Sequence, residues 1–422
     1  MRRIHILIAL LLVVFLVSFT VITRCTGSSE DLAPTSVNSL LDNSMSTFDA
    51  TEGFDRSIEK FMQRWELKGA SFALMRNDSL IYAKGYGAAN DSMACNVNNL
   101  FRIASASKLI TAVAIMKLVE GDRLSLDDQV FGEQGILNDS IFLNLYSRRM
   151  ERIRVRHLLQ HTAGFSSSYG DPAFANFTVA RVLDKPLPIS EDDIIEFTTI
   201  NKMRAEPGER YDYSNVGYII LGKIVEKVTS MSYQAYVRDS ILWPIGCYDM
   251  HIGRNFSRNR HPAEVQYYEV KEATPVEAYD GSGVMTSKSD GGNNVTALGG
   301  AGGWIASATE LLLFVASIND CPVKPDILSS ATIKMMVGDE RNRPMGWAEV
   351  RGHEWLRSGS MAGTSALIKR QKDGYTWVFI SNSSAWISHK LSNYISSHIS
   401  RAISQVEEWP ERDLFVIQEL GS

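Results

Sequence analysis

The stretch LFRIASASKLITAVAIMKLVEG, residues 100–121, decides the fold prediction. It opens with four residues typical of a strand and continues as an apolar run that ends at Gly121. We therefore expect a short strand followed by a buried helix, with Ser105 in the first turn of that helix. Lys108 follows three residues later on the same face, so its amine can reach the serine oxygen.

This placement suits a nucleophile. The first turn of a helix presents unpaired N–H groups, which stabilise negative charge on a nearby oxygen. Burial lowers the pKa of a lysine, so a buried Lys108 can share the proton of Ser105. The same spacing occurs at Ser57 and Lys60, but there the sequence DRSIEK (55–60) is charged all round and indicates a solvated helix face. We therefore predict that Ser105 is the nucleophile.

A second motif, Tyr213-Ser214-Asn215, lies between the turn-rich EPGER (206–210) and the amphipathic GYIILGKIVE (217–226). The pattern predicts a loop held by the helix that follows it. A tyrosine near cations loses its proton more readily and can serve as a general base, and an asparagine amide can orient Lys108 or a substrate carbonyl. Tyr213 is therefore the predicted partner of Lys108 in proton transfer.

The C-terminal portion contains a third motif. Residues 355–360, 363–368 and 375–380 are predicted strands, and Arg357 lies on the first of them. The small residues after it leave room for a substrate along the strand backbone. The guanidinium of Arg357 stays charged and suits a substrate carboxylate.

The backbone of this strand has a predicted role of its own. The N–H of Ser360 can form an oxyanion hole together with the N–H of Ser105, while Gly359 keeps the strand surface open. Donors aimed at a developing oxyanion lower the barrier to acyl transfer.

The three motifs together resemble those of the serine beta-lactamase and penicillin-binding protein superfamily, most closely its class C-like branch. Further similar segments are HLLQHTAGF (157–165), PIG (244–246) and GGWIAS (302–307). The resemblance covers roughly residues 54–405, which we expect to form one catalytic domain.

The resemblance implies an α/β (α+β) fold, in which a lactamase-type antiparallel sheet is flanked by helices and joined to a mainly helical subdomain. Its first hairpin would use residues 70–75 and 80–84, and strands between 345 and 381 would complete the sheet. A helix around 388–404 would pack on the sheet, and the active site would lie between the sheet and the helical region.

The resemblance also implies a reaction: a serine hydrolase forms an acyl-enzyme on an ester, a D-amino-acid peptide or a beta-lactam-like amide at the cell envelope. The substrate would be a small molecule or a peptide, with peptidoglycan-derived peptides as one source. The predicted catalytic residues are Ser105, Lys108 and Tyr213, and the predicted substrate-binding residues are Asn215, Arg357, Gly359 and Ser360.

One position departs from the family pattern. Where relatives carry lysine or histidine, this chain has Arg357, whose head is wider and permanently charged. We therefore expect an esterase or D,D-peptidase type of hydrolase rather than an efficient beta-lactamase. The same departure leaves an alternative open: a non-catalytic receptor or scaffold of this fold that binds peptidoglycan fragments or beta-lactams.

Composition and the remaining motifs predict no nucleic-acid partner, cofactor or metal. The net charge is −5, which does not suit a nucleic-acid surface. The glycine-rich stretch 291–303 lacks the lysine and spacing of a phosphate loop. His157 and His161 are spaced as on a helix but lack the glutamate of a zinc motif, so we expect them to pack or form hydrogen bonds.

The N-terminus predicts export to the bacterial cell envelope, periplasmic or surface. Two arginines precede the apolar run 6–22, which as a helix would span about 25 Å, close to the hydrocarbon thickness of a bilayer. We expect residues 1–25 to be a retained signal anchor first, a lipoprotein signal with lipidated Cys25 second, and a cleaved signal last. The polar stretch 26–53 is a predicted spacer, and 406–422 a C-terminal tail.

Three further cysteines, Cys95, Cys247 and Cys321, are widely spaced. They do not form a disulfide framework, but an oxidising compartment leaves room for one pair among them.

Overall fold

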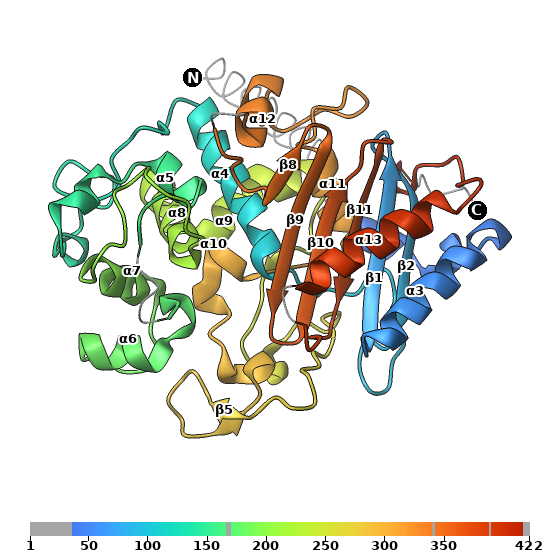
Figure 1. Cartoon of the computed structure of the whole chain (residues 1–422), viewed down its shortest axis with the longest axis horizontal. Coiled ribbons are helices and arrows are strands. Elements are labelled where there is room, and N and C mark those ends of the chain that lie inside the picture. Colours follow the sequence, from blue (N-terminus) through green and yellow to red (C-terminus); the bar gives the residue numbers. More distant parts are fainter. Residues whose placement is uncertain (1–35, 166–169, 340–341, 388–389, 417–422) are drawn as a thin grey trace, which may run out of the picture. The chain divides into compact units, whose positions relative to one another are not determined.

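The computed structural model describes residues 36–165, 170–339, 342–387 and 390–416. Their main sheet has six strands in the order β2-β1-β11-β10-β9-β8, and the paired strands are antiparallel (Figure 1). The strands are β1 (Gly69–Arg76), β2 (Ser79–Gly87), β8 (Glu349–Arg351), β9 (Glu354–Met361), β10 (Thr364–Arg370) and β11 (Tyr375–Ser381). The predicted first hairpin and the predicted C-terminal strands are therefore confirmed.

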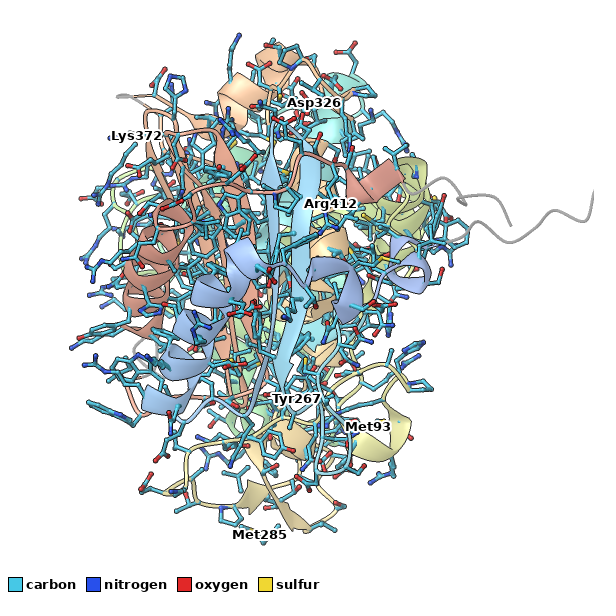
Figure 2. The ribbon with its side chains drawn as sticks, turned by 90° about the vertical axis from the view of Figure 1, so that its right-hand side faces the viewer. Met93, Tyr267, Met285, Asp326, Lys372 and Arg412 are labelled. Atoms are coloured by element: carbon cyan, nitrogen blue, oxygen red, sulfur yellow. The ribbon has the colours of Figure 1, made fainter. Side chains whose placement is uncertain are left out.

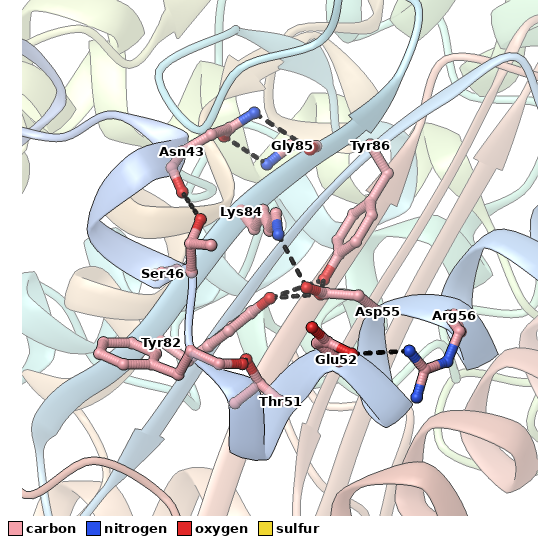
Figure 3. Close-up of polar contacts among 12 residues, drawn as sticks. Asn43, Ser46, Thr51, Glu52, Asp55, Arg56, Tyr82, Lys84, Gly85 and Tyr86 are labelled. Atoms are coloured by element: carbon pink, nitrogen blue, oxygen red, sulfur yellow. Dashed lines mark hydrogen bonds and ion pairs between the residues drawn. The ribbon is translucent and has the colours of Figure 1, made fainter.

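Both faces of this sheet are covered, which explains why β1 and β11 are apolar on both sides. One face packs against α3 (Glu52–Arg64) and α13 (Leu391–Ser404), and the other against α11 (Ala308–Ala316) (Figure 1). Asp55 fastens α3 to β2: its carboxylate accepts hydrogen bonds from Tyr82, Lys84 and Tyr86 (Figure 3).

A mainly helical region adjoins the sheet, on the left of Figure 1. It contains α5 (Val155–Leu159), α6 (Asn176–Leu183), α7 (Glu191–Thr199), α8 (Asn215–Thr229), α9 (Tyr233–Val237) and α10 (Gly299–Gly302). The predicted fold class, an antiparallel sheet flanked by helices with a helical subdomain, is confirmed.

Two smaller sheets and two more α-helices lie among the described residues. A second sheet joins β3 (Phe101–Arg102), β7 (Trp304–Ala306) and β4 (His251–Ile252), and a two-stranded one joins β5 (Val276–Glu277) and β6 (Met285–Thr286). Two further helices are α2 (Val37–Leu40) and α12 (Ser330–Val337).

The predicted buried helix is α4 (Ser107–Glu120), which lies between the sheet and the helical region. Eleven of its fourteen residues are buried, as expected for a helix that is apolar on every side. Ser105 itself lies not in the first turn of this helix, as predicted, but in the 3₁₀ turn η3 (Ala104–Ala106) that directly precedes it. Ala104 adopts a φ of 46°, in the left-handed region, so the chain turns sharply between β3 and α4.

Residues 36–53 do not form the spacer that we predicted. The compact unit begins at Ser36, whose hydroxyl donates to Asp249 (2.7 Å), and the Asn38 amide donates to the same carboxylate (2.8 Å). Further along, Asn43 exchanges hydrogen bonds with the backbone of Gly85. These polar residues pack onto the domain because they satisfy its buried polar groups.

The described part of the predicted tail also packs on the domain. Arg412, labelled in Figure 2, donates from Nε to the carbonyl of Ile81 on β2 (2.9 Å). Trp409 lies edge-on to Phe54 and Tyr82, with ring centroids 5.3 and 5.4 Å away. Trp409 is thus part of the core that packs against α3, and Arg412 fastens the tail to β2.

Two N-terminal predictions fall on residues that the structure does not describe: the apolar run 6–22 and Cys25. Within the described ranges, no helix is both long and apolar enough to cross a membrane. The three described cysteines are all free, so the disulfide that we left open among Cys95, Cys247 and Cys321 is not formed.

Candidate active site

The three predicted motifs meet at one cavity of about 520 Å³ between η3, the loop before α8, and β9. Ser105 comes from η3, Tyr213 from the loop, and Arg357 from β9, and all three line the cavity. Residues that are 252 positions apart in sequence therefore share one site. Other residues that line the cavity include Gln160, His161, Tyr211, Arg343, Trp347, Gly359 and Ser360.

The hydroxyl of Ser105 has two hydrogen-bonding neighbours that can carry its proton. Its Oγ lies 2.7 Å from the Tyr213 Oη and accepts a hydrogen bond from the Lys108 Nζ at 3.3 Å. The distance to Tyr213 is within the roughly 2.6–3.2 Å expected of a nucleophile and its base, and the distance to Lys108 is slightly longer, as is common without a bound substrate. The structure thus brings together the three residues that we predicted as catalytic.

Lys108 is buried, and its amine makes two other hydrogen bonds. Nζ donates to the Asn215 Oδ1 and to the carbonyl of Ala301 on α10, each at 2.6 Å. Burial lowers the pKa of Lys108 to about 8. The amine can therefore lose its proton near neutral pH, as a general base must.

Tyr213 has a lowered pKa for a different reason. Burial of its hydroxyl raises the pKa, but the positive charges of Lys108 and Arg357 outweigh that effect and bring it to about 8. The side chain as a whole is 43% exposed, so its hydroxyl reaches Ser105 from the open side of the cavity. Lys108 and Tyr213 thus titrate in the same pH range.

Arg357 is more deeply buried than we expected of a residue that binds a substrate carboxylate. It is 3% exposed, and its Nε and Nη2 both donate to the backbone carbonyl of Ser105, at 2.8 and 2.6 Å. The guanidinium therefore holds the turn that carries the nucleophile. Its binding of a substrate carboxylate stays a prediction.

Gly359 has a packing role that we did not predict. A Cβ at this position would lie 2.2 Å from the carbonyl oxygen of Ile103 and 2.9 Å from the backbone nitrogen of Ser105. The glycine therefore lets β9 lie directly against η3. This contact brings the backbone of Ser360 next to the turn of Ser105, and their joint oxyanion hole stays a prediction.

His161 supports Tyr213. Its ring lies 4.5 Å from the ring of Tyr213, and its Nδ1 accepts a hydrogen bond from the backbone N–H of Ser214 at 3.1 Å. Burial, together with the charge of Lys108, holds its pKa well below the usual value, so the ring is neutral. The expectation that His161 packs and forms hydrogen bonds is confirmed.

Sequence reasoning missed Asp171. Its Oδ2 accepts a hydrogen bond from the Asn215 Nδ2 at 2.5 Å, which extends the polar chain beyond Lys108. The only local signal was Asp171-Pro172, a helix-start pattern that occurs at many solvated turns. No group of three or more histidine, cysteine or acidic residues among those described could hold a metal ion.

Fold and site fit one class of protein, and the chain belongs to it: the serine beta-lactamase and penicillin-binding protein superfamily. The family model described as Beta-lactamase matches residues 54–395.

Two curated relatives match about half of the chain. Protein flp of Staphylococcus aureus (strain MRSA252) is 29% identical over 232 residues, which are 54% of this chain and 43% of the relative. Penicillin-binding protein 4* of Bacillus subtilis (strain 168) is 28% identical over 220 residues, which are 50% of this chain and 43% of the relative. The match therefore spans less than half the length of either relative.

Solved structures show the same fold at low sequence identity. The D-amino acid amidase from Ochrobactrum anthropi SV3 has a TM-score of 0.65 and 21% identity, and covers 86% of this chain and 100% of its own. The penicillin-binding protein homologue from Pyrococcus abyssi has a TM-score of 0.61 and 23% identity, and covers 85% of this chain and 77% of its own. The hydrolase EstCE1 has a TM-score of 0.61 and 18% identity, and covers 84% of this chain and 98% of its own.

Proposed function

We propose that this protein is a cell-envelope serine hydrolase that forms an acyl-enzyme through Ser105. The observation that carries the proposal is the placement of the Ser105 hydroxyl between the Tyr213 hydroxyl and the Lys108 amine, at 2.7 and 3.3 Å. A hydroxyl that touches two groups with pKa values of about 8 can give up its proton as it attacks.

The reaction has two halves. The Ser105 Oγ attacks the substrate carbonyl carbon while its proton passes to Lys108 or Tyr213. The tetrahedral intermediate collapses as Tyr213 returns a proton to the leaving alcohol or amine. Water then attacks the acyl-enzyme ester while the same pair takes its proton; that proton passes to the Ser105 Oγ as the ester bond breaks, and the carboxylic acid leaves. Backbone N–H groups of Ser105 and Ser360 hold the oxyanion in both halves, a contribution of roughly 3–4 kcal/mol per donor in tested enzymes.

The substrate we propose is an ester or a D-amino-acid peptide rather than a beta-lactam that is turned over efficiently. Structures of this fold include an enzyme described as a D-amino acid amidase and a hydrolase described as having acyltransferase activity. Arg357 fills the floor of the cavity beside Ser105, so a compact bicyclic ring has less room against β9 than it would beside a lysine.

We also propose that the domain works at the bacterial cell envelope, where peptidoglycan-derived peptides would be within its reach. The apolar run 6–22 after two arginines supports attachment to the membrane, either as a retained anchor or through a lipidated Cys25. A detergent-phase partition of the exported full chain, with and without Cys25→Ser, separates the two modes: only lipid attachment is lost in the variant.

The test of the proposal is covalent labelling. Wild-type protein is treated with a fluorophosphonate and, in parallel, with a tagged penicillin, and the adduct is mapped by mass spectrometry. We expect fluorophosphonate labelling at Ser105, loss of the adduct in Ser105→Ala and retention in Ser57→Ala. Ser57 is a matched control because it has the same spacing to a lysine, yet its hydroxyl contacts His398 on α13.

The outcomes separate the two functions that the sequence left open. Turnover of small esters or of D-amino-acid peptides after labelling at Ser105 supports the hydrolase. Binding of penicillin or peptidoglycan fragments without turnover or labelling at Ser105 would establish the non-catalytic receptor instead. An adduct at any other serine contradicts the assignment of the nucleophile.

A further inference from the structure

Asn215 forms a bridge between Lys108 and an acidic side chain outside the three motifs. The Asn215 Oδ1 accepts from the Lys108 Nζ at 2.6 Å, and its Nδ2 donates to the Asp171 Oδ2 at 2.5 Å. The other oxygen of Asp171 accepts from the backbone N–H of Ala173 at 3.1 Å, in the turn η6 (Pro172–Phe174). Asp171 is therefore held by its own turn while it holds Asn215.

This contact decides which way the amide of Asn215 points. An ionised carboxylate can only accept hydrogen bonds, so the NH₂ end of the amide must face Asp171. The carbonyl end then faces Lys108. Without the carboxylate, an ammonium would still favour the carbonyl end of the amide, but once Lys108 is neutral the NH₂ end could turn toward it and donate to its lone pair.

The direction of the amide in turn decides which proton Lys108 can give up. Its Nζ donates to the Asn215 Oδ1, the Ala301 carbonyl and the Ser105 Oγ, and it also lies beside the hydroxyl of Tyr213. The first two can only accept, so they keep two N–H bonds of the amine whether it is charged or neutral. When Lys108 loses one proton, its lone pair is therefore directed at the hydroxyls of Ser105 and Tyr213, which are hydrogen-bonded to each other.

We propose that Asp171 is a positioning residue of the reaction: by fixing the Asn215 amide, it aims the lone pair of Lys108 at these two hydroxyls. The inference rests on the proposed function, because it concerns the base that activates the Ser105 nucleophile. Asp171 is not among the residues that line the cavity, and its hydrogen-bonded link to Lys108 runs through Asn215.

Asp171 also affects the charge of the site. Its carboxylate favours the protonated form of Lys108, as does a deprotonated Tyr213, whereas burial and the charge of Arg357 disfavour it. His161 also faces the site but is neutral. Loss of the Asp171 charge must therefore lower the pKa of Lys108, an effect that a purely structural turn residue would not produce.

The experiment compares Asp171→Asn with wild type and with Asp139→Asn, which removes an equal charge from the distant, exposed ion pair with Lys227. The readouts are the rate of fluorophosphonate labelling at Ser105 as a function of pH, and thermal unfolding. Because Asn can still cap the turn at Ala173, we expect Asp171→Asn to fold like wild type.

In Asp171→Asn the amide of Asn215 can turn its NH₂ end to Lys108. We expect the limiting labelling rate to fall at least about 10-fold, as for other misplaced catalytic groups, and its apparent pKa to move down. The double variant Asp171→Asn/Asn215→Asp restores an acceptor beside Lys108, so it should recover part of the rate with an apparent pKa above that of wild type.

Each outcome decides one question. If wild type is labelled at Ser105 and Asp171→Asn reacts at the wild-type rate with an unchanged pH profile, the role of Asp171 is refuted and the proposed function stands. A fall in rate with no shift of the pH profile and no recovery in the double variant also refutes it. If wild type itself is not labelled at Ser105, the proposed function fails.

Discussion

At the scale of single residues, Lys108 and Tyr213 are unusual because each titrates near pH 8. Lys108 reaches that value through burial, and Tyr213 through the nearby positive charges that outweigh its burial. Below pH 8 the lysine is an ammonium and the tyrosine a phenol, so neither can accept a proton. Loss of one proton from the pair creates the base that the reaction needs.

The first prediction follows because the pair gains its base as the pH rises. We expect kcat/KM for a small ester to rise with pH and to level off above an apparent pKa near 8. Lys108→Ala and Tyr213→Phe should each lower the acylation rate at least about 100-fold. Tyr213→Phe should leave thermal stability roughly unchanged, whereas Lys108→Ala should lower it because the Ala301 carbonyl loses its partner. Stopped-flow acylation from pH 6 to 10 measures both effects. Wild-type turnover in either folded variant would remove that residue from the mechanism.

The second prediction concerns Arg357. Because its Nε and Nη2 hold the carbonyl of Ser105, Arg357→Ala should lower kcat for all substrates and also raise KM for those that carry a carboxylate. Arg357→Lys keeps the charge in a narrower head and should shift the balance toward beta-lactams. Steady-state kinetics on an ester, a D-amino-acid peptide and a cephalosporin measure this. A wild-type kcat/KM for the cephalosporin near about 10⁶ M⁻¹s⁻¹ would contradict the proposed preference.

At the scale of elements, the site depends on the close contact of β9 with η3. Strand β9 presents Gly359 to the backbone of Ile103 and Ser105, and Arg357 two residues earlier reaches the same turn. The turn is sharp, with Ala104 in the left-handed region. Because a strand and a tight turn position the nucleophile together, a change on the strand must also move the serine.

The third prediction tests this contact. Gly359→Val places side-chain atoms where the carbonyl of Ile103 lies, so we expect a loss of about 1–3 kcal/mol of stability and a large loss of acylation. Gly53→Ala is the matched control: nothing lies within 4 Å of its Cβ, and alanine favours the helix α3 that contains it. Thermal unfolding and labelling of both variants decide the matter. Full labelling of Gly359→Val would show that the contact does not position Ser105.

At the scale of the whole molecule, the polar segment 36–53 packs against parts of the domain that lie far along the chain. Asn38 donates to Asp249 and accepts from Ser307 and Thr309 at 2.7 and 2.9 Å. Asp249 lies 211 residues away in sequence and Thr309 271 residues away. This segment therefore ties together parts of the chain that are far apart, and its removal leaves buried polar groups without partners.

The fourth prediction follows from these contacts. A chain that starts at Ser36 should unfold at a clearly higher temperature than one that starts at Phe54. Each buried polar group left without a partner costs about 1–3 kcal/mol. Because each kcal/mol lowers Tm by roughly 2–4 °C, the loss of a few such hydrogen bonds should lower Tm clearly. Differential scanning calorimetry of the two chains measures the gap. Equal Tm values would mean that segment 36–53 does not contribute to the stability of the domain.

Much of the site was predictable because its signals are local. Ser105 and Lys108 are one helical turn apart in an apolar helix, and Tyr213 stands just before another helix, so short-range periodicity placed each on its element. The hairpin and the C-terminal strands follow from the same kind of pattern. The resemblance of the three motifs to a known family then predicted that they meet.

Only the tertiary structure decided how distant polar groups pair. Asp171 reaches Asn215 across 44 residues, Arg357 turns inward to a carbonyl 252 residues away, and the polar stretch 36–53 packs on the domain although its composition suggested a spacer. Hydrophobic periodicity records only whether a residue faces the core. The partner of a buried polar group depends on which chain segments the fold brings within about 3 Å, and that information lies in no local stretch of sequence.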